Sequence, residues 1–115
     1  MSSKFGKELR KIRIDFDDSI SGMASKLNIS TSYLSAIEAG KRNIPSDMVS
    51  KIIDAYKLDK ERSEILKQSE IDSAKEVNIK LTNVSIEQRN LVFALSRKLN
   101  EISDEECFKI LEKLK

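Results

Sequence analysis

The stretch "NISTSYLSAIEAGKRNIP", residues 28–45, decides the fold because it contains a short helix with boundary signals at both ends. Ser30 precedes "TSYLSAIEA" and has the hydroxyl side chain that favours the N-cap position. Gly40 follows this segment, where a helix commonly ends in left-handed conformation. The stretch therefore predicts a short helix that is closed by a turn carrying Lys41 and Arg42.

A second short helix is predicted immediately before this one, over "ISGMASKLN", residues 20–28. Asn28 ends it at a position where asparagine tolerates left-handed geometry. Two short helices joined by three to four residues are typical of a helix-turn-helix, in which the second helix lies in the major groove of DNA. An ordinary helical hairpin has the same connection, so the spacing alone leaves both interpretations open.

Three further helices are predicted around this pair. Before it, Phe5, Leu9, Ile12 and Phe16 recur at helical spacing and form one apolar stripe. After it, Ser46 and Asp59 are candidate N-caps for two more amphipathic helices. Residues 1–75 are therefore predicted to form an all-α domain of five helices.

Residues 76–115 show a different pattern and are predicted to form an extension. Apolar side chains alternate with polar ones over residues 77–82, which predicts a short half-buried strand. Two serines, each followed three residues later by Gln or Glu, form capping boxes and predict two helices, over about 86–102 and 104–114.

A lone strand needs a partner for its hydrogen-bonding groups, and no second strand is evident in the sequence. We therefore expect this extension to form a homodimer in which the strands of two subunits pair. The alternative is an extended segment that folds back on the fifth helix. The expected dimer contacts are Val77, Ile79 and Leu81 of the strand and Leu91, Leu95 and Leu99 of the helix beneath it.

The composition argues against an enzyme. The chain has 115 residues, 39% of them hydrophobic and 35% charged, with no histidine and a single cysteine, Cys107. These counts exclude catalytic sites built on histidine and zinc sites built on histidine or paired cysteines. No acidic cluster has calcium-loop spacing, so no metal or other cofactor is expected.

The same composition favours a cytoplasmic protein. A lone cysteine suits a reducing compartment, and the charged N-terminal sequence contains no apolar signal segment. No stretch approaches the roughly 18 apolar residues of a membrane helix. Residues 1–45 contain eight basic and five acidic side chains, so the positive excess of this nearly neutral chain lies around the predicted helix pair.

At this point the sequence resembles the XRE family of helix-turn-helix proteins, which includes lambda-type phage repressors and Cro. The resemblance covers about residues 5–58 and is carried by "LRKIR", "MASKLNIS" and "YLSAIEAGKRNIP". It implies a lambda-repressor-like DNA-binding domain that binds double-stranded DNA. It also implies an ion pair between Arg13 and Glu38, which would join the first helix to the end of the recognition helix.

The resemblance also assigns DNA contacts. The family's base-contacting positions fall on Thr31, Ser32 and Ala36, with Tyr33 and Ser35 nearby. The turn Gly40-Lys41-Arg42 matches the family's turn that meets the phosphate backbone.

General chemistry adds further phosphate contacts. The helix N-terminus at Ser30 offers free N–H groups, and the amide of Asn43 follows the basic turn. Arg10 and Lys11 of the first helix are further candidates, although a solvated helix face explains them equally well.

The chain departs from the family pattern at two places. Ile20 replaces the usual Gln at the start of the second helix, and Asp17-Asp18 replaces the usual Gly-Leu, which adds two negative charges near the expected DNA side. The small base-reading side chains form none of the bidentate contacts that discriminate bases by about 1–3 kcal/mol. Limited readout by each subunit therefore favours a dimer.

The leading interpretation is a dimeric repressor that binds an inverted-repeat operator with half-sites roughly 34 Å apart. The alternative is an antitoxin-like or other protein-interaction module with weak or no DNA binding, whose partner would be a toxin or an antirepressor.

Overall fold

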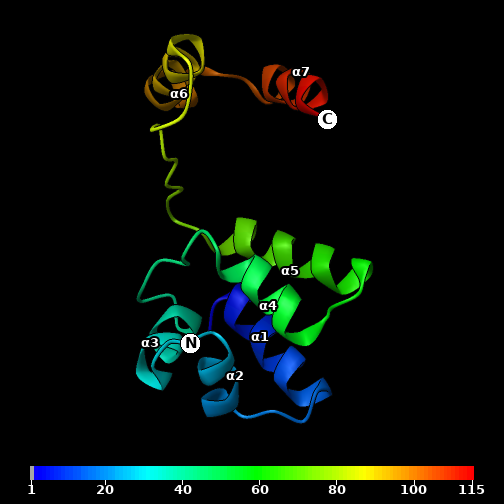
Figure 1. Ribbon diagram of the computed structural model, residues 1–115. Helices are drawn as coiled ribbons and strands as arrows, with labels where there is room; N and C mark the ends of the chain where they lie inside the picture. Colours follow the sequence, from blue (N-terminus) through cyan, green and yellow to red (C-terminus); the bar gives the residue numbers. More distant parts are fainter. Residues whose placement is uncertain (1) are drawn as a thin grey trace. The chain divides into compact units, whose positions relative to one another are not determined.

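The computed structural model describes residues 2–115 and divides into two compact units, Met1–Asn78 and Ile79–Lys115. Every regular element in the described part of the chain is helical, which confirms the all-α prediction (Figure 1). The first unit contains α1 (Lys4–Asp15), α2 (Ile20–Lys26), α3 (Thr31–Glu38), α4 (Met48–Tyr56) and α5 (Lys60–Ser73). The second contains α6 (Ile86–Lys98), a 3₁₀ turn (Leu99–Glu101) and α7 (Asp104–Leu114).

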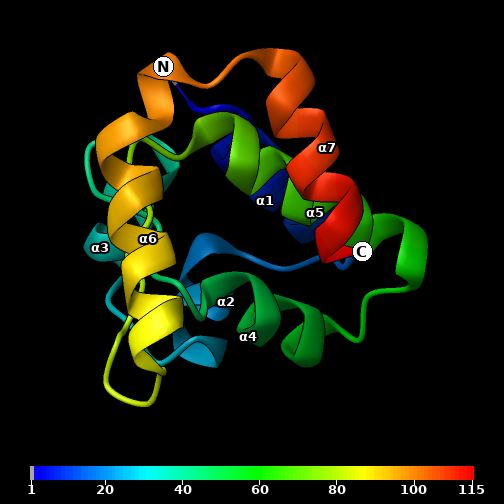
Figure 2. The ribbon, with the colours of Figure 1, turned by 90° about the horizontal axis from the view of Figure 1, so that it is seen from above.

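The first unit is built around the apolar faces of its five helices. The helix α1 packs against both α3 and α5, while α2 packs on α3 and α4 packs on α5. Figure 2 shows α1 alongside α5. Phe16, the last member of the predicted α1 stripe, is half-exposed and packs edge-on against Tyr56, with ring centroids 5.3 Å apart. The buried apolar side chains are Phe5, Leu9, Ile12, Met23, Ala24, Leu27, Leu34, Ile37, Met48, Val49, Ile52, Tyr56 and Leu66.

The N-terminus of α1 is fixed on the C-terminus of α3, and this contact orients the helix-turn-helix. The backbone N–H of Ser3 and its hydroxyl both donate to the carbonyl of Glu38, at 3.0 and 3.1 Å. A Cβ added to Gly6 would lie 2.2 Å from that same carbonyl oxygen. Because both sides of this contact are backbone, only glycine at this position allows the two helices to approach so closely.

The helix boundaries follow the local capping signals with one exception. The side chains of Ser30, Asp59, Ser85 and Ser103 cap the helices that follow them, as predicted. The exception is α4, where Asp47 rather than Ser46 occupies the N-cap position.

The predicted strand over residues 77–82 is wrong. The structure shows no strand among the described residues, and this segment is irregular. The side chains of Val77 and Ile79 are 79% and 56% exposed. A period-two pattern makes a strand only where a second strand supplies hydrogen bonds, and the described chain contains none.

The second unit has no buried side chain among its described residues. Both predicted capping boxes are present, at Ser85–Gln88 and Ser103–Glu106, so the helices are well bounded. Their apolar side chains nevertheless remain uncovered: Leu91, Leu95 and Leu99 are 65%, 43% and 56% exposed. Apolar surface of this extent usually marks an interaction site.

No helix in the described part of the chain is both long and apolar enough to cross a membrane.

Candidate nucleic-acid interface

The turn between α2 and α3 is tightly closed by backbone and side-chain hydrogen bonds. Asn28 adopts left-handed geometry with φ of 58°, and the N–H of Ile29 donates to the carbonyl of Ala24 at 3.0 Å. Ser30 then begins α3 by accepting a hydrogen bond from the N–H of Tyr33 at 3.1 Å. Since Ala24 is only 2% exposed, its small side chain lets α2 and α3 pack closely.

The outer face of α3 carries the side chains that were expected to read bases. Thr31, Ser32 and Ser35 are exposed, while Tyr33 and Ala36 are half-buried. The inner face of the same helix is anchored in the core by Leu34 and Ile37. A shallow surface hollow is lined by Ser30, Ser32, Tyr33, Ala36, Lys41 and Arg42, so part of the expected base-reading and phosphate-binding set lies together. Thr31, Ser35 and Asn43 do not line this hollow.

The basic turn after α3 folds back on that helix. Gly40 has φ of 79°, which glycine adopts without strain. The N–H groups of Lys41 and Arg42 both donate to the carbonyl of Ala36, at 2.9 and 3.3 Å. The Arg42 guanidinium lies 5.1 Å from the centroid of the Tyr33 ring, a cation–π contact that holds this cation beside the outer face of α3.

The end of α3 is fixed from the inside by a buried ion pair. Arg13 donates two hydrogen bonds to the carboxylate of Glu38, at 2.6 and 3.0 Å. The two side chains are only 9% and 6% exposed. Such a bidentate pair restricts both distance and angle, so it sets the position of the turn that follows α3 relative to α1.

Asp18, which the sequence placed as an unfavourable charge near DNA, has a structural role. Its carboxylate accepts hydrogen bonds from the ammonium of Lys26 and the hydroxyl of Tyr56, each at 2.6 Å, and from the N–H of Ser19 at 2.8 Å. These contacts, that of Lys26 above all, lower the pKa of the Asp18 carboxyl from 3.8 to about 2. A Cβ on Gly22 would lie 2.0 Å from this carboxylate, so the glycine makes room for it.

The Asp18 network predicts a specific loss of stability in acid. Because the folded-state pKa lies below the unfolded value, the network stabilises the fold fully above about pH 4 and loses this effect as the pH falls to about 2. We expect Asp18→Asn to unfold at lower urea concentration than the wild type at pH 7, and the two midpoints to converge near pH 2. Asp54→Asn, at an exposed carboxyl, is the control. If the difference between the two urea midpoints stayed the same from pH 7 to pH 2, the stabilising role of the ionised Asp18 carboxylate would be contradicted.

The α1 candidates lie apart from the hollow and already have partners. Arg10 donates to the hydroxyl of Ser2 at 2.5 Å, and Lys11 lies 3.9 Å from the carboxylate of Glu8. Both cations are exposed, but neither lines the hollow.

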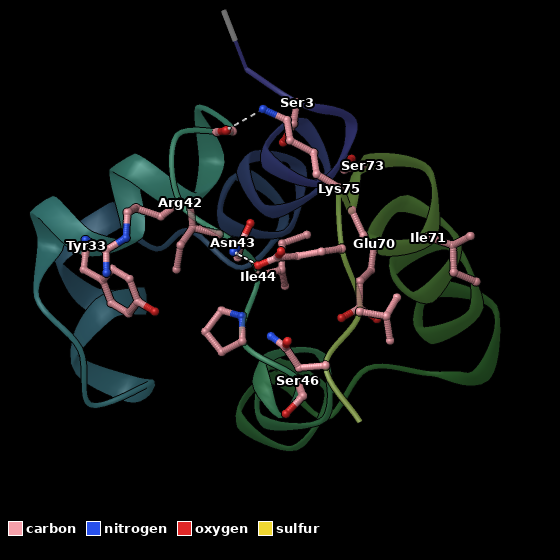
Figure 3. Close-up of a pocket in the computed structure, with 17 residues that line it drawn as sticks. Ser3, Tyr33, Arg42, Asn43, Ile44, Ser46, Glu70, Ile71, Ser73 and Lys75 are labelled. Atoms are coloured by element: carbon pink, nitrogen blue, oxygen red, sulfur yellow. Dashed lines mark hydrogen bonds between the residues drawn. The ribbon is translucent and has the colours of Figure 1, made fainter. Parts of the chain in front are cut away.

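A segment far along the chain contacts the basic turn. The amide nitrogen of Asn43 donates to the carboxylate of Glu76, and the ammonium of Lys75 donates to the carbonyl of Gly40 at 3.3 Å. All four residues line a cleft of about 570 Å³, and Figure 3 shows Asn43 and Lys75 at this cleft. Burial raises the pKa of Glu70, which lines the same cleft. No local sequence signal predicts these contacts, because their partners lie more than 30 residues apart.

No group of three or more potential metal-ligating side chains occurs within residues 2–115. No curated protein and no solved structure was found to match the chain. Residues 9–62 match the family model described as "Helix-turn-helix", a range that includes α2, α3 and the basic turn. The chain thus contains, over these residues, a helix-turn-helix domain of the XRE type, a family of DNA-binding regulators rather than enzymes.

Proposed function

We propose that the protein is a dimeric transcriptional repressor that binds an inverted-repeat operator through α3 and the basic turn. The observation that carries this proposal is the position of Arg42, held by the Tyr33 ring beside the exposed polar face of α3. In this arrangement one surface offers both base-reading hydroxyls and a fixed cation. Phosphate contacts supply a large share of the affinity, and base contacts supply the specificity.

The side chains on α3 determine how the protein would achieve specificity. Thr31, Ser32 and Ser35 have single hydroxyls, and Ala36 offers only a methyl group. Hydroxyls contact several base edges, and a methyl group contacts thymine, but neither forms a bidentate pair. Specificity would therefore come from two half-sites, roughly 34 Å apart, that are read by two copies of the domain.

The second unit would supply the dimer contacts. Its helices expose Leu91, Leu95 and Leu99, and no other part of the second unit buries them. A second copy that covered these side chains would remove apolar area from water at roughly 25 cal/mol per Å². A dimer bound across a promoter would then repress by blocking access.

Titration of random duplex DNA across a salt series tests the DNA-binding part. The logarithm of the binding constant should fall linearly with the logarithm of salt concentration. Arg42→Ala should weaken binding about 10-fold and reduce the salt slope by about 1. Arg97→Ala is the matched control, since Arg97 also stacks on an aromatic ring, Phe93, at 5.6 Å but lies in the second unit. Negligible binding with no salt dependence would refute this function.

The alternative proposal is an antitoxin-like module whose second unit covers a different protein. The same uncovered leucines support it, because their exposure does not depend on the identity of the partner. Sedimentation separates the two: a monomer at micromolar concentration favours a foreign partner, and a dimer favours the repressor.

The contact between Glu76 and Asn43 predicts a gain of DNA affinity on mutation. The Glu76 carboxylate accepts a hydrogen bond from the Asn43 amide, which was expected to bind phosphate. It also places a negative charge beside the basic turn. Two unit charges about 4 Å apart interact by about 1 kcal/mol in water, so Glu76→Ala should tighten binding to duplex DNA roughly 5-fold at low salt. Asp72→Ala, which removes a carboxylate paired with Lys4 at 3.8 Å, is the control. Unchanged affinity of the Glu76 variant would show that this contact does not oppose DNA.

A further inference from the structure

The helix α7 has an uncovered apolar stripe with a regular charge pattern. The stripe consists of Cys107, Ile110, Leu111 and Leu114, which recur at i, i+3, i+4 and i+7 and therefore share one face. Ile110, Leu111 and Leu114 are 45%, 58% and 74% exposed. A stripe of this spacing is suited to packing against another helix.

Each edge of the stripe is acidic near the start of α7 and basic near its end. At about 100° per residue, Asp104 lies along one edge, and Glu106 and Lys113 lie along the other. Lys115, the C-cap residue of α7, follows the edge of Asp104, and its ammonium donates to the carboxylate of Glu112 at 3.1 Å. On the opposite face, Glu105 and Lys109 pair within the helix at 3.7 Å. The charges beside the stripe are thus separated by sign along the helix.

The charges along α7 are complementary to those of a second α7 that runs in the opposite direction. Two copies of α7 packed in parallel would bring acidic start against acidic start and basic end against basic end. Packed antiparallel, the acidic start of each copy would lie beside the basic end of the other. About an axis near Ile110 and Leu111, Asp104 and Glu106 would lie roughly 3 Å along the helix from Lys115 and Lys113 of the other copy, within reach of the long lysine side chains. Opposite charges that flank a helix contact favour one orientation and one partner.

We propose that α7 packs antiparallel against α7 of a second copy of this chain, about a two-fold axis near Ile110 and Leu111. Cys107 of each copy lies opposite Leu114 of the other in this arrangement. This proposal rests on the dimer proposed above and names one of the surfaces that form it. A two-fold contact of this kind uses the same patch on both subunits.

The native cysteine provides a test of orientation. In antiparallel packing, the two Cys107 residues lie about 10 Å apart along the axis, at 1.5 Å rise per residue. Disulfides need Cα atoms within about 7 Å, so the native chain should not cross-link. A 1:1 mixture of the native chain with the double variant Cys107→Ser/Leu114→Cys should form a disulfide-linked dimer under mild oxidation. We expect at least 10-fold more linked dimer, measured on non-reducing gels, than either protein gives alone.

The other outcomes overturn specific parts of the proposal. Efficient linkage in the native chain alone would indicate parallel packing. A sedimenting dimer with no linkage in the mixture would reject the α7 contact while leaving the repressor dimer intact. A monomer would reject both. The Cys107→Ser variant, followed by sedimentation and circular dichroism, controls for loss of folding.

The charge pattern provides a second test that uses no cysteine. Asp104→Lys and Lys115→Glu should each raise the dimer dissociation constant several-fold, because each places like charges together at both ends of the contact. An equimolar mixture of the two variants should restore the native dissociation constant. Exchanging the charges of Glu105 and Lys109 on the outer face should leave it unchanged. Failure of the mixture to recover would contradict the antiparallel arrangement.

Discussion

Replacing Arg13 with alanine is expected to destabilise the first unit by about 3–5 kcal/mol, because it leaves the Glu38 carboxylate buried without its cation. Glu38 is 4% exposed, and Arg13 donates both of the hydrogen bonds that its carboxylate receives in the structure. Small domains unfold with a free energy of only about 5–15 kcal/mol. Much of the stability would therefore be lost, and urea unfolding followed by circular dichroism would measure the loss.

A double variant separates the effect of an unpaired charge from the effect of the contact itself. Arg13→Met combined with Glu38→Leu removes both charges and keeps most of the buried volume, so it should recover most of the lost stability. Lys51→Ala is the surface control: it removes a 3.0 Å pair with Asp47 whose side chains are more than half exposed, and it should cost less than about 1 kcal/mol. A loss from Arg13→Ala no larger than that from Lys51→Ala would contradict a structural role for the pair.

The parts of the fold that sequence predicted well depend on short-range signals. Ser30 caps α3 through a residue three positions away, and Gly40 ends it within the next turn. The apolar stripe of α1 depends only on helical spacing. Such signals are complete within one helix, so they predict where each helix of the first unit lies without knowledge of its tertiary contacts.

The parts that sequence missed depend on partners far along the chain. In the sequence alone, Asp18 is an unfavourable charge near DNA; in the structure, its carboxylate accepts a hydrogen bond from Tyr56, 38 residues later. The sequence alone predicts that the Asn43 amide binds phosphate, whereas in the structure this amide donates a hydrogen bond to Glu76. The alternation over residues 77–82 failed as a strand signal for a related reason: an extended pattern does not reveal whether a second strand lies within reach.

The second large effect is expected from a charge placed on α6. Leu95 is 43% exposed and lies one turn from Leu91 on the same face of α6, and Leu99 follows as the C-cap of this helix. Because linked binding of two modules raises affinity by about 10²–10⁴, Leu95→Asp should convert a dimer into a monomer and weaken binding to a selected operator about 100-fold. Sedimentation and fluorescence anisotropy would measure the two changes on the same sample.

The size of this effect depends on the charge lying at a dimer contact rather than on charge alone. Asn90→Asp adds the same charge to a different face of α6 and is expected to leave both association and DNA affinity unchanged. The core of the first unit contains no residue of α6, so Leu95→Asp should also leave the helix-turn-helix folded and able to bind non-specific DNA weakly. If Leu95→Asp stays dimeric and keeps its operator affinity, the dimer contact lies elsewhere. If it becomes monomeric without loss of affinity, a single domain suffices for operator recognition.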